Sequence, residues 1–270
     1  DPDGVARLAA PMVALVHHPL ALEPGLSAPQ AQAMAARERA NLSRARHIVV
    51  TSGHIAGLLQ ETYGVAPERI SVARPGFVAP NLRPVPEVPP LVLSVGLLAR
   101  RKGHDVLLRA LARITDLDWR AVIVGRLHEP ETVAALHALR AEMGLAERVE
   151  IAGEISQPAL EALYGRATLF ALATRYEGYG IVFDEAMGHG LPIISTLAGA
   201  VPETVAPGAG ILVPPEDDAA FGEALRRMLN EPALRAGCAS AARQAAAALG
   251  DWAAAAQVVA DAVRVHTSAE

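Results

Sequence analysis

The sequence predicts an α/β fold in which parallel sheets carry helices on both faces. Apolar runs of four to six residues alternate along the chain with amphipathic stretches of ten to sixteen, a pattern typical of βαβ units. In the later part, three apolar runs end in glycine, at Gly96, Gly125 and Gly153, which are 29 and 28 residues apart. Each interval is about the length of one βαβ unit. Because ligands of open α/β sheets bind at the carboxyl ends of strands, these glycines predict a site at that edge.

The first part of the chain is expected to form a small domain of its own. Strands are expected at residues 12–17, 47–51 and 70–73. A helix is expected over residues 29–43, and a second helix begins after Ser52, whose hydroxyl suits an N-cap. Six prolines in residues 74–90 forbid a continuous helix and predict an extended connection. We therefore expect a first domain over residues 1–76 and a linker over residues 77–90.

The second part is more regular. Strands are expected at residues 91–96, 120–125, 149–153, 169–173, 192–195 and 210–213. Helices are expected at residues 103–114, 131–143, 157–166, 181–189, 217–229 and 232–249. These elements form a second domain over residues 91–249. A last helix, residues 252–265, follows Gly250 within a terminal segment, residues 250–270, and need not pack on this domain.

Composition excludes several classes of protein. A length of 270 residues with 51% hydrophobic residues suits two modest domains or one large one. A net charge of −5 gives no support for a nucleic-acid partner. The single cysteine, Cys238, excludes an internal disulfide framework and a cysteine-based zinc site. No apolar run suits a membrane helix and no signal-peptide pattern is present, so a cytoplasmic protein is expected, with peripheral membrane contact left open.

The start of the chain also carries a prediction. It begins Asp-Pro-Asp-Gly without a methionine, and a strand is expected almost at once. We therefore expect the sequence to be a segment of a longer chain.

Residues 175–195 are the most informative segment of the sequence. Glu177 and Glu185 flank a glycine-framed turn, Gly178-Tyr179-Gly180, that opens a helix. The first N–H groups of a helix lack intrahelical acceptors and attract anions, and glycines let a phosphate approach the backbone. The two carboxylates can accept hydrogen bonds from the hydroxyls of a sugar and a ribose. The segment therefore predicts a nucleotide-sugar site.

With these residues in view, the chain resembles family 4 of the GT-B glycosyltransferases, retaining enzymes that use nucleotide-sugar donors. The resemblance covers residues 12–265 and rests on four motifs. They are Ser94-Val-Gly-Leu-Leu-Ala-Arg-Arg-Lys-Gly-His104, Val122-Ile-Val-Gly125, Glu177…Glu185 with Gly190-Leu-Pro192, and Gly199-Ala-Val-Pro-Glu203. It implies two Rossmann-like domains that face each other across a cleft. The second holds the donor, and the last helix crosses back to the first.

The resemblance also implies roles for single residues. Glu177 would bind hydroxyls of the transferred sugar, and Lys102 would place its ammonium against the diphosphate. Glu185 would accept both ribose hydroxyls. The N–H groups of Gly180, Ile181 and Val182 would hold the diphosphate at the start of the helix.

Other candidate residues carry less specific signals. Arg101 is expected to share the diphosphate with Lys102, and Gly125 is expected to line the donor site at a strand end. In the family, a histidine at the end of this early strand faces the cleft near the anomeric carbon and the acceptor, so the resemblance implies that place for His17. The family usually has a second phosphate-binding arginine directly after the first strand-end glycine, where this chain has Leu97. Either a neighbouring arginine replaces that cation or activity is weakened.

The function implied is metal-independent transfer of a sugar, with retention of configuration, from a nucleotide-diphosphate-sugar to an acceptor. UDP or GDP is the expected donor nucleotide, with no further cofactor, no metal site and no nucleic-acid partner. The acceptor is left open among a sugar, a lipid and a small metabolite, as is the oligomeric state. Two alternatives stay open: a non-catalytic nucleotide-binding partner subunit, and a GT-B sugar-nucleotide epimerase.

Overall fold

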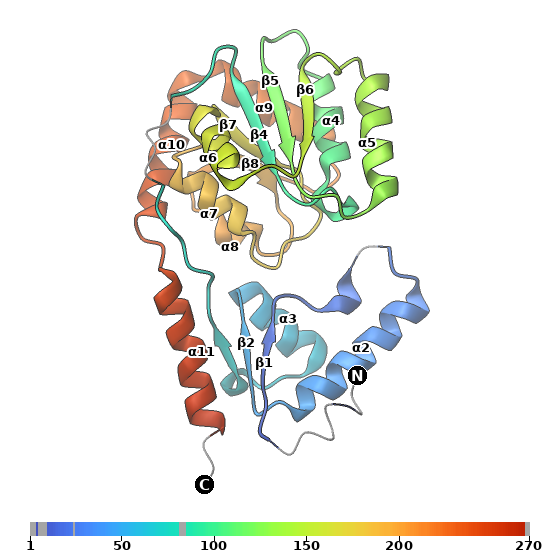
Figure 1. Cartoon of the computed structure of the whole chain (residues 1–270), viewed down its shortest axis with the longest axis vertical. Helices are drawn as coiled ribbons and strands as arrows, with labels where there is room; N and C mark the ends of the chain where they lie inside the picture. The colour runs from blue at the N-terminus through green and yellow to red at the C-terminus, as the bar shows by residue number, and fades with distance from the viewer. Residues whose placement is uncertain (1–3, 5–9, 24, 81–84, 268–270) are drawn as a thin grey trace. The chain divides into compact units, whose positions relative to one another are not determined.

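The chain folds as two compact units. A computed structural model describes residue 4 and residues 10–23, 25–80 and 85–267 (Figure 1). Asp1–Val78 and Gly250–Glu270 form the first unit, and Ala79–Leu249 forms the second. In the described part of the chain, no helix has both the length and the apolar character needed to cross a membrane.

The first unit is built on a three-stranded parallel sheet. Its strands are β1 (Val13–Val16), β2 (His47–Val50) and β3 (Ile70–Val72), in the order β1-β2-β3. Its helices and 3-10 turns are η1 (Leu20–Leu22), α2 (Ala28–Arg44), α3 (Gly53–Tyr63), η2 (Pro67–Arg69) and α11 (Trp252–Thr267). As expected, Ser52 caps α3, because its Oγ accepts a hydrogen bond from the N–H of Ile55 at 3.2 Å.

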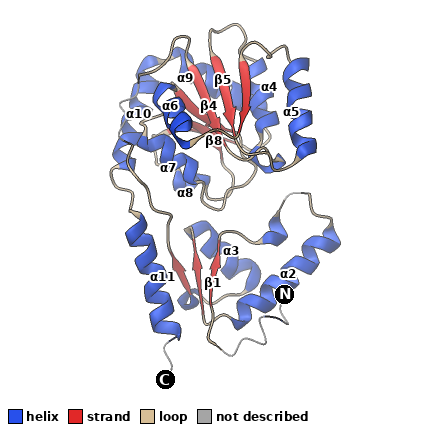
Figure 2. Cartoon of the chain, in the orientation of Figure 1, coloured by secondary structure: helices blue, strands red, loops and turns tan. Residues whose placement is uncertain are grey.

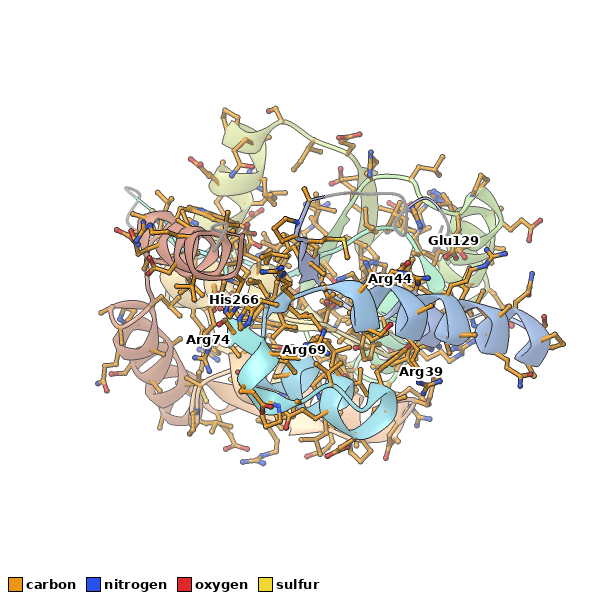
Figure 3. The ribbon with its side chains drawn as sticks, turned by 90° about the horizontal axis from the view of Figure 1, so that it is seen from below. Arg39, Arg44, Arg69, Arg74, Glu129 and His266 are labelled. Atoms are coloured by element: carbon orange, nitrogen blue, oxygen red, sulfur yellow. The ribbon has the colours of Figure 1, made fainter. Side chains whose placement is uncertain are left out.

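The last helix, α11, packs on the sheet of the first unit. Ala262 is buried with Val49 of β2 and Ala73, which follows β3. At the other end of the helix, a Cβ on Gly76 would lie 2.1 Å from the N atom of Trp252, so only glycine lets the chain pass there. His266, labelled in Figure 3, stacks on a histidine of β2, His47, with ring centroids 4.2 Å apart. Residues far apart in sequence therefore complete one fold.

The second unit contains a six-stranded sheet in which every pairing is parallel. Its strands are β4 (Leu91–Val95), β5 (Arg120–Val124), β6 (Val149–Gly153), β7 (Leu169–Leu172), β8 (Ile193–Thr196) and β9 (Gly210–Val213), in the order β6-β5-β4-β7-β8-β9. Its helices and 3-10 turn are η3 (Arg100–Lys102), α4 (His104–Ala112), α5 (Pro130–Glu142), α6 (Gln157–Arg166), α7 (Ile181–Gly188), α8 (Val201–Thr204), α9 (Asp218–Asn230) and α10 (Pro232–Ala246).

Helices cover both faces of this sheet (Figure 2). One core joins residues of α4, α5 and α9 to alternate strand residues such as Val92 and Ile123. A second core joins residues of α6, α7 and α8 to the intervening strand residues, such as Leu93 and Val122. This alternation follows from the period of two along a strand, which sends successive side chains to opposite faces. The predicted α/β class with parallel sheets is confirmed.

The boundaries of the predicted elements agree with the structure within a few residues. The expected strand at residues 91–96 is β4, and the expected helix at residues 157–166 is α6. The structure adds elements that the sequence did not indicate, among them η3 and the short helix α8.

Candidate functional site

The strand order of the second unit brings several predicted residues to one edge of its sheet. β4 lies at the centre, between β5 and β7. Because all strands are parallel, their carboxyl ends meet at the same edge. Lys102 follows β4, Gly125 follows β5, and Glu177 follows β7. The site is therefore assembled from three loops that are distant in sequence.

Lys102 and Glu177 form a buried ion pair. The Nζ atom of Lys102 lies 2.6 Å from Oε1 of Glu177, and the two residues are only 7% and 4% exposed. Thr174 donates a hydrogen bond to the same oxygen at 3.1 Å. A guanidinium nitrogen of Arg101 lies 3.9 Å from the other oxygen, Oε2. The Glu177 carboxylate thus lies beside Lys102 and Arg101, the two cations that the family resemblance assigns to a diphosphate.

The turn that carries Lys102 is fixed to the loop that carries Glu177. The backbone N–H of Arg175 donates to the carbonyl oxygen of Arg101 at 2.8 Å, and the Thr174 hydroxyl lies 3.1 Å from that oxygen. The backbones approach so closely that a Cβ on Gly103 would lie 1.8 Å from the carbonyl oxygen of Ala173. Gly103 also has a φ of 65°, which favours glycine.

Arg175 holds the same two loops together through its side chain. It forms two hydrogen bonds with Asp105 of α4, at 2.8 and 3.0 Å, and also pairs with Glu216. One of its nitrogens donates to the carbonyl oxygen of Arg100 at 2.6 Å. Burial alone would raise the pKa of Asp105, but hydrogen bonds from Arg175 and Arg109 lower it to about 2. Asp105 therefore stays ionised and keeps the contact.

A glycine with a left-handed backbone begins α7. Gly180 has a φ of 89°, and a Cβ there would lie 2.7 Å from the ring of Phe183. The N–H groups of Ile181 and Val182 come in the first turn, where α-helical amides have no acceptor within the helix. Gly199 approaches the preceding loop, because its added Cβ would lie 2.3 Å from the carbonyl oxygen of Glu177. Glycines therefore shape both the start of α7 and its contact with the loop after β7.

Glu185 lies in the same helix and is held by a tyrosine. The hydroxyl of Tyr164 in α6 donates a hydrogen bond to Oε2 of Glu185 at 2.9 Å. Burial raises the pKa of Glu185, whereas this hydrogen bond lowers it. Burial and the neighbouring carboxylate raise the pKa of Tyr164 well above its ordinary value, so the hydroxyl keeps its proton.

The loops after β4 and β5 contact each other through glycine. A Cβ on Gly125 would lie 1.8 Å from the carbonyl oxygen of Gly96, which explains the glycine without reference to a ligand.

His104 is buried beneath the loop after β4 and donates to the carbonyl oxygens of Gly96 and Leu97 at 3.3 and 3.2 Å. Burial lowers its pKa to about 4, so the ring is neutral. Leu97 is partly exposed, and of the neighbouring arginines it is Arg101 that lies beside Glu177.

His17 belongs to the first unit, whereas the other predicted residues belong to the second. It is exposed and directly follows β1, and its carbonyl oxygen accepts a hydrogen bond from Thr51 at 3.5 Å. Its role at the acceptor stays a prediction.

In the part of the chain that the structure describes, no group of three His, Cys, Asp or Glu side chains could hold a metal ion.

Sequence reasoning missed three residues that shape this site. Thr174 directly precedes the segment of residues 175–195, and Arg175 is its first residue. Both are polar and follow a buried strand, which was a usable signal. Tyr164 had no such signal, because an apolar ring in an amphipathic helix is usually a core residue.

Two known protein families match this chain. Residues 81–245 match the family described as glycosyl transferases group 1, and residues 3–79 match glycosyltransferase family 4. A D-inositol 3-phosphate glycosyltransferase from Catenulispora acidiphila is 31% identical over 247 residues, which cover 83% of this chain and 58% of that protein. One from Acidothermus cellulolyticus is also 31% identical, over 72% of this chain and 48% of its own length. The chain thus spans about half the length of the curated relatives it matches.

Solved structures give the same picture of the fold. Sucrose-phosphate synthase from Thermosynechococcus elongatus matches with a TM-score of 0.82 and 27% identity, covering 94% of this chain and 67% of that chain. Anabaena HepE, solved in complex with UDP and glucose, matches with a TM-score of 0.78 and 22% identity, covering 94% and 71%. These likenesses confirm the predicted GT-B fold class.

Proposed function

Because this chain belongs to the group 1 glycosyl transferases, we propose that it transfers a sugar from a nucleotide-diphosphate-sugar to an acceptor. The donor would be held by the second unit. Lys102 and Arg101 would meet the diphosphate, Glu177 the transferred sugar, and Glu185 the ribose.

The observation that carries this proposal is the buried pair of Lys102 and Glu177 beside the helix start at Gly180. A buried charge is costly unless it is paired, so Lys102 and Glu177 each provide the other with a partner of opposite charge. A diphosphate offers Lys102 a second anionic partner, and the sugar hydroxyls offer Glu177 hydrogen-bond donors. The site can therefore exchange one set of charge-assisted contacts for another.

The same cations would act on the reaction. The bond between the anomeric carbon and the phosphate oxygen breaks, and negative charge develops on the leaving diphosphate. Fixed cations and helix N–H groups stabilise that charge more in the transition state than in the ground state. The acceptor oxygen would bond to the same face of the anomeric carbon, and its proton would pass to the leaving phosphate oxygen.

Calorimetric titration with UDP, GDP and ADP tests donor binding. We expect one of them to bind with micromolar affinity, and we expect Lys102→Ala and Glu185→Ala to weaken it at least tenfold, about 1.4 kcal/mol. Arg227→Ala is the matched control and should bind normally, because it removes only an exposed ion pair between Arg227 of α9 and Glu231, which follows that helix. Absence of binding by the folded chain would contradict the proposal and also a nucleotide-binding partner subunit, and would favour a partner subunit that binds no nucleotide.

Retention and metal independence are proposed separately and need their own test. If the chain slowly hydrolyses an α-linked nucleotide-sugar, proton NMR should detect α-sugar before it equilibrates with the β-form. The rate should persist in excess EDTA, because the proposal assigns the cationic role to Lys102. Initial release of β-sugar would exclude retention, and loss of rate in EDTA would exclude metal independence.

The comparisons suggest where to look for donor and acceptor. HepE was solved with UDP and glucose, so UDP-glucose is the first donor to test. The curated relatives are named for D-inositol 3-phosphate, which is therefore the first acceptor to test. Both assignments are proposals for this chain.

A further inference from the structure

Tyr164 is a buried residue that none of the predicted site motifs includes. It lies in α6, is 2% exposed, and packs its ring against two other aromatic rings. The ring centroid of His189 lies 4.9 Å away with an interplanar angle of 10°, and that of Phe170 lies 6.3 Å away. The ring is thus fixed on two sides, and its hydroxyl meets Oε2 of Glu185 at 2.9 Å.

This contact restricts a flexible side chain. A free glutamate samples many rotamers, and ordering them on binding reduces affinity. The Tyr164 hydroxyl occupies one acceptor position of Oε2 and leaves Oε1 and the second lone pair of Oε2 available. Two acceptors on one carboxylate match the spacing of two neighbouring hydroxyls on a ring.

We propose that Tyr164 is a positioning residue that fixes the Glu185 carboxylate for a vicinal diol, and thereby makes the site select ribonucleotides over deoxyribonucleotides. The inference rests on the proposed function, since it requires Glu185 to receive the ribose of the donor. Tyr164 does not touch the nucleotide itself and acts through Glu185 alone.

The charges around Glu185 are consistent with this role. Tyr164, on α6, is the group that hydrogen-bonds to it and lowers its pKa against the effect of burial. His189, which directly follows α7, stacks on the ring of Tyr164. Burial lowers the pKa of His189, and Glu161 of α6 opposes that effect. Loss of the tyrosine hydroxyl therefore leaves Glu185 half-buried without its donor, and its pKa rises further.

The test separates positioning from a structural role. The probe is whichever of UDP, GDP and ADP binds most tightly, together with its 2′,3′-dideoxy form. Tyr164→Phe keeps the ring stack and removes only the hydroxyl. We expect it to weaken the ribonucleotide about tenfold, the size expected for one hydrogen bond to a charged group, and to change the dideoxynucleotide less than twofold.

The control is Tyr63→Phe, which removes a tyrosine–glutamate hydrogen bond of 2.5 Å, to Glu38, in the first unit. It should leave both affinities unchanged. Equal weakening of the two nucleotides by Tyr164→Phe would overturn the inference, because a structural defect does not distinguish sugars. So would an unchanged ribonucleotide affinity in Tyr164→Phe when Glu185→Ala still loses it, and in that case the proposed function would survive. If no nucleotide binds, both fall together.

A pH series gives a second, independent measure. In the unmodified chain, ribonucleotide affinity should fall as Glu185 is protonated at low pH. In Tyr164→Phe the midpoint of that fall should move to higher pH, because the hydrogen bond that lowers the pKa of Glu185 is gone. An unmoved midpoint would overturn the inference.

Discussion

At the scale of single residues, the Lys102–Glu177 pair places two opposing requirements on one site. Both side chains are almost completely buried, so each has lost most of its hydration. Thr174 and Arg101 compensate the carboxylate in part, at 3.1 and 3.9 Å. Removing either side chain would therefore leave the other as a buried charge without its main partner. A ligand that binds Lys102 must in turn provide Glu177 with hydrogen-bond donors.

Removing Lys102 should expose this dependence. In Lys102→Ala the Glu177 carboxylate loses its nearest cation, and we expect the free energy of unfolding to fall by about 3 kcal/mol. Adding Glu177→Gln should recover part of the loss. Urea denaturation followed by Trp119 fluorescence, in a Trp252→Phe background, reports the second unit, where Trp119 is buried. The exposed-pair control Arg227→Ala should cost less than about 0.5 kcal/mol, and a similar loss in Lys102→Ala would contradict the prediction.

His104 should make the second unit sensitive to mild acid. Its pKa in the folded chain is about 4, below the ordinary value of 6.5, because the ring is buried. Between these pH values the unfolded chain binds the extra proton, so stability falls as pH decreases from 6.5 to 4. The loss should approach about 3 kcal/mol, at roughly 1.4 kcal/mol per pKa unit.

His104→Gln isolates this contribution. Glutamine keeps a donor for the carbonyl oxygens of Gly96 and Leu97 but does not titrate in this range. Urea denaturation of both proteins at several pH values between 7.5 and 4.5 should show a smaller decline in the variant. Asp105 does not interfere with this measurement. Its pKa is lowered to about 2 in the folded chain, so its contribution to stability is lost only below pH 4. Parallel declines would show that His104 is not the responsible group.

At the scale of elements, the 3-10 turn η3 is positioned by its close approach to the loop after β7. Gly103 ends this turn, and its missing Cβ is what lets the carbonyl oxygen of Ala173 come near. Gly144, after α5, has almost the same backbone, with a φ of 69° against 65°, but open space around it. The two positions therefore separate the backbone requirement from the packing requirement.

Alanine substitution at both glycines tests that distinction. Gly144→Ala should cost only the left-handed backbone penalty, about 1 to 2 kcal/mol. Gly103→Ala should cost about 2 kcal/mol more, because the turn must move away from β7, and should also weaken nucleotide binding by displacing Lys102. Urea denaturation and calorimetric titration of the two variants make the comparison. Equal losses of stability with unchanged binding would show that the close approach does not position the site.

The sequence predicted the long elements of this fold because each carries a clear periodicity. β4 and α6 were expected within one residue of where they lie. η3 and α8 were not, because turns this short have no period and depend on tertiary contacts. η3, for example, is held by hydrogen bonds to residues that follow β7, about seventy positions later in the chain.

The site was predictable as a set of residues but not as a set of contacts. Glu177, Glu185 and Lys102 were singled out by motif, yet nothing in the sequence indicated that Lys102 and Glu177 pair with each other. Tyr164 was missed for a similar reason, since its partner is 21 positions away on another helix. Spacing along the chain indicates which residues share an edge, whereas packing decides which of them touch.

At the scale of the whole molecule, the two units divide the proposed work unequally. The donor-site residues, from Arg101 to Glu185, all belong to the second unit, and His17 belongs to the first. α11 comes last in the chain but completes the first unit, through Ala262 against Val49 and Ala73. The stability of the first unit therefore depends on α11, while donor binding should not.

Two substitutions in α11 test this separation. Ala262 is 6% exposed, so Ala262→Asp places a carboxylate without a partner against β2 and should destabilise the first unit by about 3 kcal/mol or more. Ala260→Asp, at an exposed position of the same helix, shares only the loss of helix propensity, about 0.7 kcal/mol. Hydrogen exchange should accelerate in β2 and not in β7 for Ala262→Asp, and nucleotide affinity measured by calorimetry should stay within twofold of the unmodified chain. Loss of nucleotide binding in Ala262→Asp, with Ala260→Asp unaffected, would show that the donor site requires the first unit, and the assignment of the donor to the second unit alone would then be wrong.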